Sequence, residues 1–375
     1  MIGLNEHQLD NAKALVRNRQ EDVHLSDRQG DSEKQYGKKR RRKAVSTEKV
    51  LTVENVHVSF KTFGGEVQAL RGVSFDLYKG ETLAIVGESG CGKSVTANTI
   101  MGLIPQPPGR IKNGKVLFKG KDLTKLNKAG LRKIQGVDIS MIFQDPMTAL
   151  NPTLQIGEQL TEGYRTHHKV SKVDARKKAI EMLELVGIPN PQERLKQYPH
   201  QFSGGMRQRI VIAIALICEP ELLIADEPTT ALDVTIQAQI LELFDEIQEK
   251  TGVSIILITH DLGVVAKIAD RIAVMYAGKV IEIGEKREIF YTPQHPYTKG
   301  LLKSVPRLDL KEEELQPIEG TPPDLFSPPK GCPFTARCPF AMDVCDRVYP
   351  ETTQLSKDHA VNCWLLDERA KRVFA

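Results

Sequence analysis

A glycine-rich loop between an apolar run and a helical segment is the first feature of this 375-residue chain that could do chemistry. Gly87-Glu-Ser-Gly-Cys-Gly-Lys93-Ser94 follows the apolar run Leu83–Val86 and precedes the helical stretch Val95–Met101. The glycines let successive backbone N–H groups point at phosphate oxygens, and the following helix adds its positive N-terminal end. In such a loop, the lysine reaches the β- and γ-phosphates and the serine hydroxyl ligates Mg²⁺. The loop therefore predicts nucleotide binding.

Two carboxylates stand at the end of another apolar run. Asp226 and Glu227 follow Leu222–Ala225, and carboxylates at strand ends hold Mg²⁺ beside substrate phosphates. Asp226 is the candidate for the Mg²⁺ contact, and Glu227 could polarise an attacking water as a general base. His260 follows a third apolar run, Ile255–Thr259, and could place an imidazole at the γ-phosphate. A lone histidine after a strand is usually structural, so the other motifs are what make His260 a site residue.

A second anion-binding turn lies between the loop and the carboxylates. Phe202-Ser203-Gly204-Gly205 leads into the apolar stretch Ile210–Cys218, which has the pattern of a helix. A serine–glycine turn before a helix presents backbone N–H groups to an anion, here without a second lysine. One chain thus carries two turns that could recognise phosphate.

Short apolar runs alternate with helical stretches through the middle of the chain. The three runs named above are bounded by turn or polar residues, which is typical of central parallel strands buried on both faces. Helical patterns at Ala175–Val186 and Ile236–Lys250 separate them, and this alternation predicts a layered α/β domain. Alternating apolar residues from Val50 onward indicate an antiparallel strand. Beyond about Glu285, prolines accumulate, so we expect little regular structure there.

Taken together, these motifs resemble the ATP-binding cassette (ABC) family of transporter ATPases. Gly87–Ser94 matches the Walker A loop, Gln144 the Q-loop, Ser203–Gly205 the signature motif, Asp226 with Glu227 the Walker B motif and catalytic glutamate, Asp233 the D-loop, and His260 the switch histidine. The resemblance covers roughly residues 47–285. It implies an α/β fold with a P-loop core, an antiparallel β subdomain and an α-helical signature subdomain.

The resemblance also assigns roles to single residues. The residues implied to contact ATP are Phe63, Gly87, Ser89, Gly90, Cys91, Gly92, Lys93, Ser94 and Val95. Mg²⁺ contacts are implied for Ser94, Gln144 and Asp226, and catalytic roles for Glu227, His260 and Gln144. Ser203, Gly204 and Gly205 are implied to contact the ATP of a partner. The signature reads FSGGM where LSGGQ is commonest, and Val95 replaces a frequent threonine. Neither change removes a phosphate contact made by the backbone or by Ser203. Phe63, 24 residues before Gly87, stands where the family places an aromatic that stacks on adenine, although Phe60 is close and either could instead be a core residue.

Four of the six cysteines crowd the end of the chain. Cys332, Cys338, Cys345 and Cys363 are spaced C-x5-C-x6-C-x17-C. In a chain without a secretion signal, such a group suggests metal binding before disulfides. The spacing lacks the tight C-x2-C pair of zinc ribbons, whereas four thiolates on proline-stiffened loops suit a [4Fe–4S] cluster. Zinc, and thiols without metal or with a disulfide, are the alternatives.

The C-terminal part resembles the extension of oligopeptide and dipeptide permease ATPases. The matching segments are His295-Pro-Tyr-Thr-Lys-Gly-Leu-Leu, Gly320-Thr-Pro-Pro, Gly331-Cys-Pro-Phe and Arg337-Cys-Pro. With Phe143-Gln-Asp-Pro nearer the middle, the similarity covers about 47–367 and looks closest to the oligopeptide-type subunit with a cysteine-bearing tail. It implies that the chain is the ATP-hydrolysing motor subunit of an importer of short peptides.

This resemblance implies partners as well. ATP would lie between the Walker A loop of one subunit and the signature turn of a second, related ABC ATPase, which gives a heterodimer. Two transmembrane permease subunits and an extracytoplasmic peptide-binding protein complete such a complex, so the chain would work at the cytoplasmic face of the cell membrane. The family contacts the coupling helices of the permease through the region Asn151–Tyr164.

Composition limits the remaining functions. The longest apolar run is nine residues, well short of the roughly 18–20 of a membrane-spanning helix, and no basic-then-apolar leader begins the chain. We therefore expect a soluble intracellular protein. Residues 1–46 carry 11 Lys and Arg against 7 Asp and Glu, and the rest has 41 of each, which argues against an extended nucleic-acid footprint. The run Lys38–Lys43 is either an anion-binding patch or part of a solvated tail.

These observations predict three regions and leave one rival function. The regions are a basic, disordered extension (1–46), an ABC ATPase domain (47–285) and a C-terminal extension with the cysteines (286–375). The rival is an ABC-type ATPase acting on nucleic acid or the ribosome. DNA-repair ATPases of this type interrupt the cassette with long coiled coils, but only 110 residues separate Lys93 from Ser203, without sustained heptads. A translation factor would carry two cassettes, and an inactive subunit would not need Glu227 and His260, so we expect no nucleic-acid partner.

Overall fold

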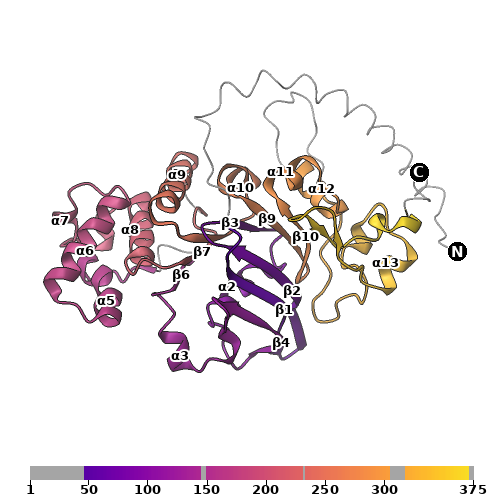
Figure 1. Ribbon diagram of the computed structural model, residues 1–375, viewed down its shortest axis with the longest axis horizontal. Helices are drawn as coiled ribbons and strands as arrows, with labels where there is room; N and C mark the ends of the chain where they lie inside the picture. Colours follow the sequence, from indigo (N-terminus) through magenta and orange to yellow (C-terminus); the bar gives the residue numbers. More distant parts are fainter. Residues whose placement is uncertain (1–45, 145–148, 231–232, 305–316, 371–375) are drawn as a thin grey trace, which may run out of the picture. The chain divides into compact units, whose positions relative to one another are not determined.

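The computed structural model describes residues 46–144, 149–230, 233–304 and 317–370. They divide into two compact units, a first unit of Ser46–Val280 and a second unit that begins at Ile281. The predicted basic run Lys38–Lys43 lies outside the described residues. Figure 1 shows the elements in chain order, from indigo to yellow.

A parallel sheet forms the centre of the first unit. Its strands run in the order β9-β3-β8-β7-β6. Their bounds are β3 (Thr82–Val86), β6 (Ile139–Ile142), β7 (Leu222–Asp226), β8 (Ser254–Ile258) and β9 (Arg271–Tyr276). Every residue of these strands is buried, so the prediction of central strands covered on both faces is confirmed.

An antiparallel sheet lies beside this core in the first unit. Its order is β2-β1-β4-β5, with β1 (Lys49–Thr62), β2 (Gly65–Tyr78), β4 (Gly109–Phe118) and β5 (Lys121–Asp122). Buried and more exposed residues alternate along much of β1, as in a strand with one wet face. β1 and β2 form a long hairpin whose turn carries Phe63.

The helices of the first unit form two groups. The first group follows strands of the parallel sheet and includes α2 (Lys93–Ile100), α9 (Val234–Thr251) and α10 (Leu262–Ile268). A second group, magenta in Figure 1, lies together at one end of the unit: α5 (Ile156–His168), α6 (Lys172–Leu185), α7 (Pro191–Arg194) and α8 (Gly204–Leu216). The apolar stretch of α8 packs against α5, α6 and β6, which joins the helical group to the sheet. Short turns of helix complete the unit at Leu123–Lys125, Lys128–Arg132 (α3) and Pro199–Gln201.

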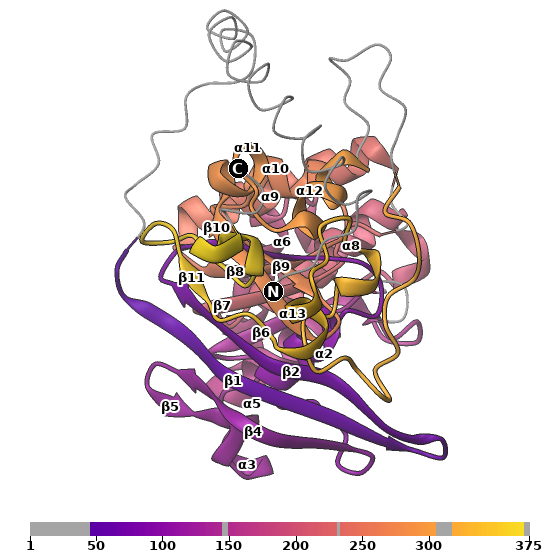
Figure 2. The same cartoon turned by 90° about the vertical axis from the view of Figure 1, so that its right-hand side faces the viewer.

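The second unit has short elements, as predicted from its prolines. They are β10 (Lys279–Glu285), in which the unit begins, α11 (Lys286–Tyr291), α12 (Pro296–Lys303), α13 (Asp343–Arg347), β11 (Thr353–Gln354), β12 (Ala360–Val361) and the helical turns Thr335–Arg337 and Trp364–Leu366. β12 pairs with both β10 and β11 in antiparallel fashion. Figure 2 shows this part, in orange and yellow, as brief elements joined by long loops.

A buried carboxylate organises the second unit. Glu282 on β10 accepts hydrogen bonds from the backbone N–H groups of Gln294 and His295, at 2.8 and 3.0 Å, and lies 2.9 Å from Nε2 of His359. Burial alone would raise the pKa of Glu282, but these hydrogen bonds lower it, so the group stays ionised. One charged side chain thus ties β10, the start of α12 and the β12 hairpin together.

Among the described residues, none of the helices combines the length and apolar character that crossing a membrane requires.

Candidate functional site

The glycine loop predicted to bind phosphate has the backbone that the role demands. Gly87, directly after β3, has φ +150°, and a Cβ there would lie 2.2 Å from the carbonyl oxygen of Met275. Gly92, the residue before α2, has φ +107°, and a Cβ there would lie 2.9 Å from the carbonyl oxygen of Ala69. No side chain fits at either position, so the loop keeps its open curve only with glycine.

Lys93 and Ser94 open α2 with their polar groups at the loop. Lys93 is buried, and its ammonium donates to the carbonyl oxygens of Gly87 and Glu88 at 2.8 and 3.0 Å. The first turn of α2 contains no acidic residue, so the positive end of the helix is not neutralised by its own side chains. A cation, a bare helix end and the glycine loop together fit the phosphates of a nucleotide.

Ser89 and Gly90 are exposed at the loop, while Cys91 is buried beneath it. The Cys91 sulfur lies 2.9 Å from where a Cβ on Gly87 would stand, and burial raises the pKa of its thiol. The thiol therefore stays protonated and packs inside the loop. A phosphate contact at Cys91 would therefore be made by its backbone N–H. Val95, on α2, is half-buried.

Asp226 ends β7 directly opposite the start of α2. Its Oδ1 accepts a hydrogen bond from the Ser94 hydroxyl at 3.1 Å, so two of the three expected Mg²⁺ ligands meet, while the third, Gln144, bonds to Glu227. Burial raises the pKa of Asp226, because a carboxylate out of water needs a compensating charge. A hydroxyl and a desolvated carboxylate beside a phosphate loop are a donor set that fits Mg²⁺.

Glu227 is the point where the loops of the site converge. Its Oε2 accepts hydrogen bonds from Nε2 of Gln144 at 2.9 Å and from the Thr230 hydroxyl at 3.1 Å. Its Oε1 lies 3.4 Å from Nδ1 of His260. Glu227 has φ +48°, a left-handed conformation that costs free energy in a non-glycine residue, and its N–H donates to the carbonyl of Ile258 at 2.9 Å. The structure thus brings the three predicted catalytic residues, Gln144, Glu227 and His260, together.

Two residues around Glu227 were not predicted from the sequence as partners of the site. The hydroxyl of Thr230 donates a hydrogen bond to Oε2 of Glu227. Gln208 is buried on α8, and its Nε2 donates to the carbonyl of Pro228 at 2.6 Å, which connects the signature helix to the loop after Glu227. In the sequence, Gln208 is noticeable only as a polar residue close to the start of the nine-residue apolar run. Its contact with the carbonyl of Pro228 could not be inferred from residue spacing.

The signature turn is exposed and locally capped. The Ser203 hydroxyl accepts a hydrogen bond from the N–H of Met206 at 3.3 Å and begins α8, while Gly205 lies against Ile236 of α9. Asp233 caps α9 in the same way, accepting from the N–H of Ile236 at 2.9 Å. The turn and the D-loop therefore meet through Ile236.

Phe63 is fully exposed at the tip of the β1–β2 hairpin, whereas Phe60 is partly buried. Phe63 lines an open recess of about 1000 Å³ together with residues 106–110. A core role for Phe63 is therefore wrong, and its stacking on adenine stays a prediction.

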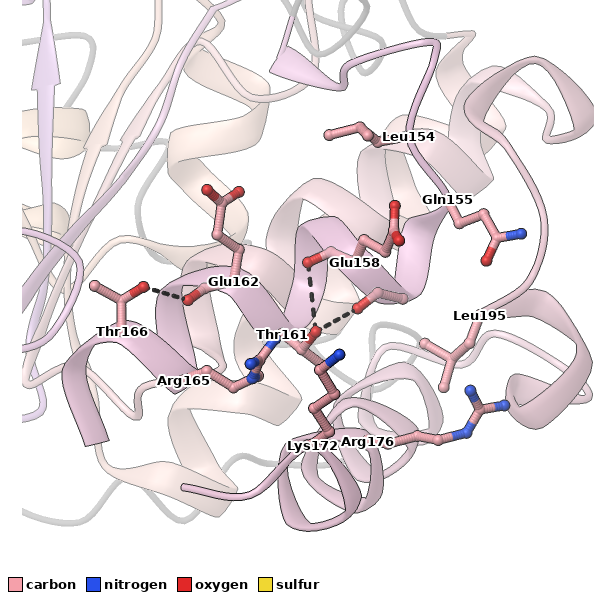
Figure 3. Close-up of a pocket in the computed structure, with 11 residues that line it drawn as sticks. Leu154, Gln155, Glu158, Thr161, Glu162, Arg165, Thr166, Lys172, Arg176 and Leu195 are labelled. Carbon is pink, nitrogen blue, oxygen red and sulfur yellow. Dashed lines mark hydrogen bonds between the residues drawn. The ribbon is translucent and has the colours of Figure 1, made fainter. Parts of the chain in front are cut away.

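A groove of about 680 Å³ lies between α5, α6 and the end of α7, called here the α5–α6 groove. In Figure 3 the carboxylates of Glu158 and Glu162 lie on its upper side, and Arg165, Lys172 and Arg176 lie lower. Leu154 and Leu195 add apolar surface. The groove overlaps the segment Asn151–Tyr164 that resemblance assigns to permease contact.

The four C-terminal cysteines line one small cavity, called here the cysteine cavity. Its volume is about 10 Å³ as the side chains stand, and His295, Phe340, Trp364 and Leu365 share its wall. All four thiols are free of disulfides. Among the described residues, no three His, Cys, Asp or Glu side chains converge as they would around a single metal ion.

The thiols of the cysteine cavity are desolvated. Burial raises the pKa of Cys338 strongly and that of Cys363 to about 12, and the backbone N–H groups of Phe340 and Leu365 act against the two shifts. Cys332 has the same arrangement with the N–H of Phe334. At these three positions the N–H group two residues after the cysteine opposes the shift, but burial is the larger cause and the pKa of each thiol stays raised.

Comparison with known proteins defines the class. Residues 70–230 match the family model for the ABC transporter, and residues 281–345 match the model for the oligopeptide/dipeptide transporter C-terminal region. The dimeric structure of MJ0796, a bacterial ABC transporter cassette, superimposes with a TM-score of 0.56 at 29% identity, over 63% of this chain and 98% of that one. The chain belongs to the ABC transporter family, and it is an ABC-type ATPase.

Similar proteins indicate the subfamily to which the chain belongs. The chain is 72% identical over 324 residues to the dipeptide transport ATP-binding protein DppD of Bacillus subtilis (strain 168), covering 86% of this chain and 97% of that protein. It is 58% identical over 330 residues to the oligopeptide transport ATP-binding protein OppD of the same strain, covering 88% and 92%. Within the ABC family, it belongs with the ATP-binding proteins of oligopeptide and dipeptide transporters.

Replacing Glu227 by Gln should leave ATP binding intact and lower turnover by about 10²–10⁴-fold, because the amide keeps the shape of the side chain but loses the base. ATP affinity and hydrolysis rate, measured in the assembled complex, check this. Glu246→Gln, an exposed carboxylate on α9, is the matched control and should hydrolyse ATP normally. Near-normal hydrolysis by Glu227→Gln would remove Glu227 from the catalytic role.

Proposed function

We propose that this ATPase is the motor subunit of an importer that takes up oligopeptides or dipeptides across the cytoplasmic membrane. The observation that carries the motor function is the convergence of Gln144, Thr230 and His260 on the Glu227 carboxylate, beside Asp226. The peptide substrate class is supported by the match of residues 281–345 and by the names of the relatives.

The residues of the site divide the work of ATP hydrolysis. The loop N–H groups and Lys93 bind the phosphates, and Ser94 and Asp226 hold the Mg²⁺ that neutralises charge on them. Gln144 adds a side-chain amide next to Glu227, at the same end of the parallel sheet. Glu227 accepts a proton from the attacking water, and His260 lies on the other oxygen of this carboxylate. Because three side chains fix Glu227, the base is oriented before the nucleotide arrives.

A partner ATPase completes the site in this proposal. Ser203 is exposed at the start of α8, where a helix N-terminus can bind the γ-phosphate held by another subunit. Gln208 connects that helix to the loop after Glu227, so closure onto a partner can reach this chain's own base. We propose a heterodimer with a second, related ABC ATPase.

The α5–α6 groove is the proposed docking site for the permease. It offers separated acidic and basic sides, with apolar surface from Leu154 and Leu195, which suits a short amphipathic helix of a membrane subunit. Two permease subunits and an extracytoplasmic peptide-binding protein complete the complex. This chain then lies at the cytoplasmic face of the membrane, with the ATPase in residues 47–285 and the extension in residues 286–375.

The complex that co-purifies with the tagged chain from solubilised membranes should, once reconstituted in vesicles, take up a radiolabelled short peptide when ATP is supplied. Uptake should be lost with Glu227→Gln and kept with Glu246→Gln, because only the first substitution stops hydrolysis. ATPase stimulation by single-stranded nucleic acid, with none by peptide-loaded binding protein, would favour the rival function and overturn the proposal.

Ser203→Arg should disturb the nucleotide on the partner subunit more than the nucleotide on this chain, because the signature turn would face the partner's ATP. Photo-crosslinking of labelled ATP in the mixed dimer separates the two sites. Ser171→Arg, at the capping serine of α6, is the matched control and should change neither. Loss confined to this chain's own nucleotide would contradict the arrangement.

The proposal also includes a [4Fe–4S] cluster bound by the four cysteines of the cysteine cavity. Its support is the donor set, since four thiols free of disulfides share one cavity. As the described side chains stand, no three of them converge as they would around a metal ion. The cavity has room for about one water molecule, so the thiol side chains must turn outward to admit a cluster. When bound, the cluster would join four loop positions of a unit with little apolar core.

Chain purified without oxygen should be brown, with about four irons for its four thiolate ligands. Replacing Cys338 by Ser should lower the iron content and loosen residues after about 320, while ATP binding at Lys93 survives. Cys218→Ser, a buried cysteine outside the cavity, is the control and should keep the iron. Stoichiometric zinc without iron would contradict the iron–sulfur assignment. Folded, active protein without either metal would contradict any metal-binding role for the four cysteines.

A further inference from the structure

A side-chain hydrogen bond joins α9 to the residue that follows His260. Nε2 of Gln237, on α9, donates to Oδ2 of Asp261 at 2.8 Å. We infer that Gln237 positions the His260 imidazole for ATP hydrolysis by holding Asp261. The inference rests on the catalytic role proposed for His260 and adds a positioning residue that acts through it.

Burial does not fix the ring of His260. Its side chain is 64% exposed, and its Nδ1 lies 3.4 Å from Oε1 of Glu227, which is long for a hydrogen bond. The direction of such a ring depends on the backbone that carries it. Before His260, this backbone is anchored, because Thr259 is buried and its N–H donates to the carbonyl of Ile85 on β3 at 3.3 Å. After His260, it depends on how Asp261 is held.

Both carboxylate oxygens of Asp261 accept hydrogen bonds, and they do so from different helices. Oδ1 caps α10, accepting from the N–H groups of Gly263 and Val264 at 2.8 and 3.2 Å. Oδ2 accepts from Gln237 on α9. The cap orients the carboxylate relative to α10, and the bond from Gln237 ties the same carboxylate to α9. The turn that carries His260 is therefore held between two helices.

The chemistry of the pair determines which atoms meet. A carboxylate oxygen only accepts hydrogen bonds, so the Gln237 amide must face Asp261 with its nitrogen. Both side chains are half-buried, and a hydrogen bond to a charged group contributes more than one between neutral groups. Gln237 lies one turn into α9, and its backbone N–H donates to the carbonyl of Asp233 at 2.9 Å. A movement of the D-loop at Asp233 would therefore reach His260 through Gln237.

The test removes the donor in two ways, in the complex that co-purifies with the tagged chain. Gln237→Met keeps the length of the side chain without a donor, and Gln237→Glu also sets two carboxylates against each other. We expect kcat for ATP hydrolysis to fall about 10- to 100-fold in both variants. The KM for ATP should stay unchanged, because the residues proposed to bind ATP are not altered. If Gln237→Glu does not fold, Gln237→Met decides the question.

The control places the same charge on the same helix. Gln239 is exposed on α9, and Nη2 of Arg209 donates to its Oε1 at 3.4 Å. A carboxylate at this position gains an arginine as its neighbour, so Gln239→Glu should keep a normal kcat.

Exchanging donor and acceptor separates positioning from general damage. When Gln237→Glu is combined with Asp261→Asn, the new carboxylate can accept from the new amide, and the asparagine oxygen can still cap α10. Most of the lost kcat should therefore return.

A double-mutant cycle with His260 tests whether Gln237 acts through the ring. His260→Ala should lower kcat by itself. Adding Gln237→Met to His260→Ala should cause no further loss, because a residue that only positions the imidazole has no effect once the imidazole is gone.

The outcomes distinguish this inference from the proposed function. The role of Gln237 would be overturned, with the ATPase site left standing, by a normal kcat in Gln237→Met or by a changed KM with kcat unaltered. No recovery in the exchanged pair, or a full further loss on top of His260→Ala, would overturn it as well. A normal kcat in His260→Ala would overturn both the catalytic role of His260 and the inference about Gln237.

Discussion

The carboxylate of Glu227 accepts hydrogen bonds from Gln144 and Thr230 and lies 3.4 Å from Nδ1 of His260, so one side chain holds three loops of the ATP site. Its backbone conformation, with φ +48°, costs of order 1–3 kcal/mol in a non-glycine residue. The hydrogen bond from its N–H to Ile258, at the end of β8, holds it there. Gln144 and Thr230 share Oε2, so either can hold it without the other, whereas removing His260 would leave Oε1 without its contact. The strained turn is therefore the constraint on which the order of the site depends.

Strand register separates the two acidic residues into two roles. Asp226 is the last residue of β7 and pairs with Ile258 in the parallel ladder, whereas Glu227 leaves the strand in a left-handed conformation with φ +48°. Asp226 thus meets Ser94 at the start of α2, while Glu227 turns toward the loops of Gln144 and His260. A slip of β7 by one residue would put either Glu227 or Ala225 where Asp226 now meets Ser94. Burial of these strands on both faces resists such a slip, which links the apolar composition of the sheet directly to the chemistry at its edge.

The two units are stabilised by different interactions. The first unit has a continuous apolar core around β7, β8 and α8. The second unit relies on Glu282, whose ionised carboxylate joins His359 and the start of α12, and on the cavity of four cysteines. Removing Glu282 would leave His359 and two N–H groups buried without their partner, a larger loss than breaking an exposed ion pair. In this unit, these polar contacts add to a smaller set of buried apolar residues that includes Tyr297, Phe334 and Val361.

The sequence was sufficient for features that are local in the chain. The glycine loop, the apolar strands and the capped turn at Ser203 are contiguous, and each element follows from residues within about ten positions of one another. The partners of Glu227 were less accessible, because Gln144 and His260 could be grouped only through a family resemblance, and Gln208 and Thr230 gave no signal of their contacts. His295 stood out in the sequence only as one letter of a matching segment. Its environment depends on how residues 332–363 fold back on α12, and only the structure gives that arrangement. A residue whose chemistry depends on distant neighbours becomes interpretable only when those neighbours are placed.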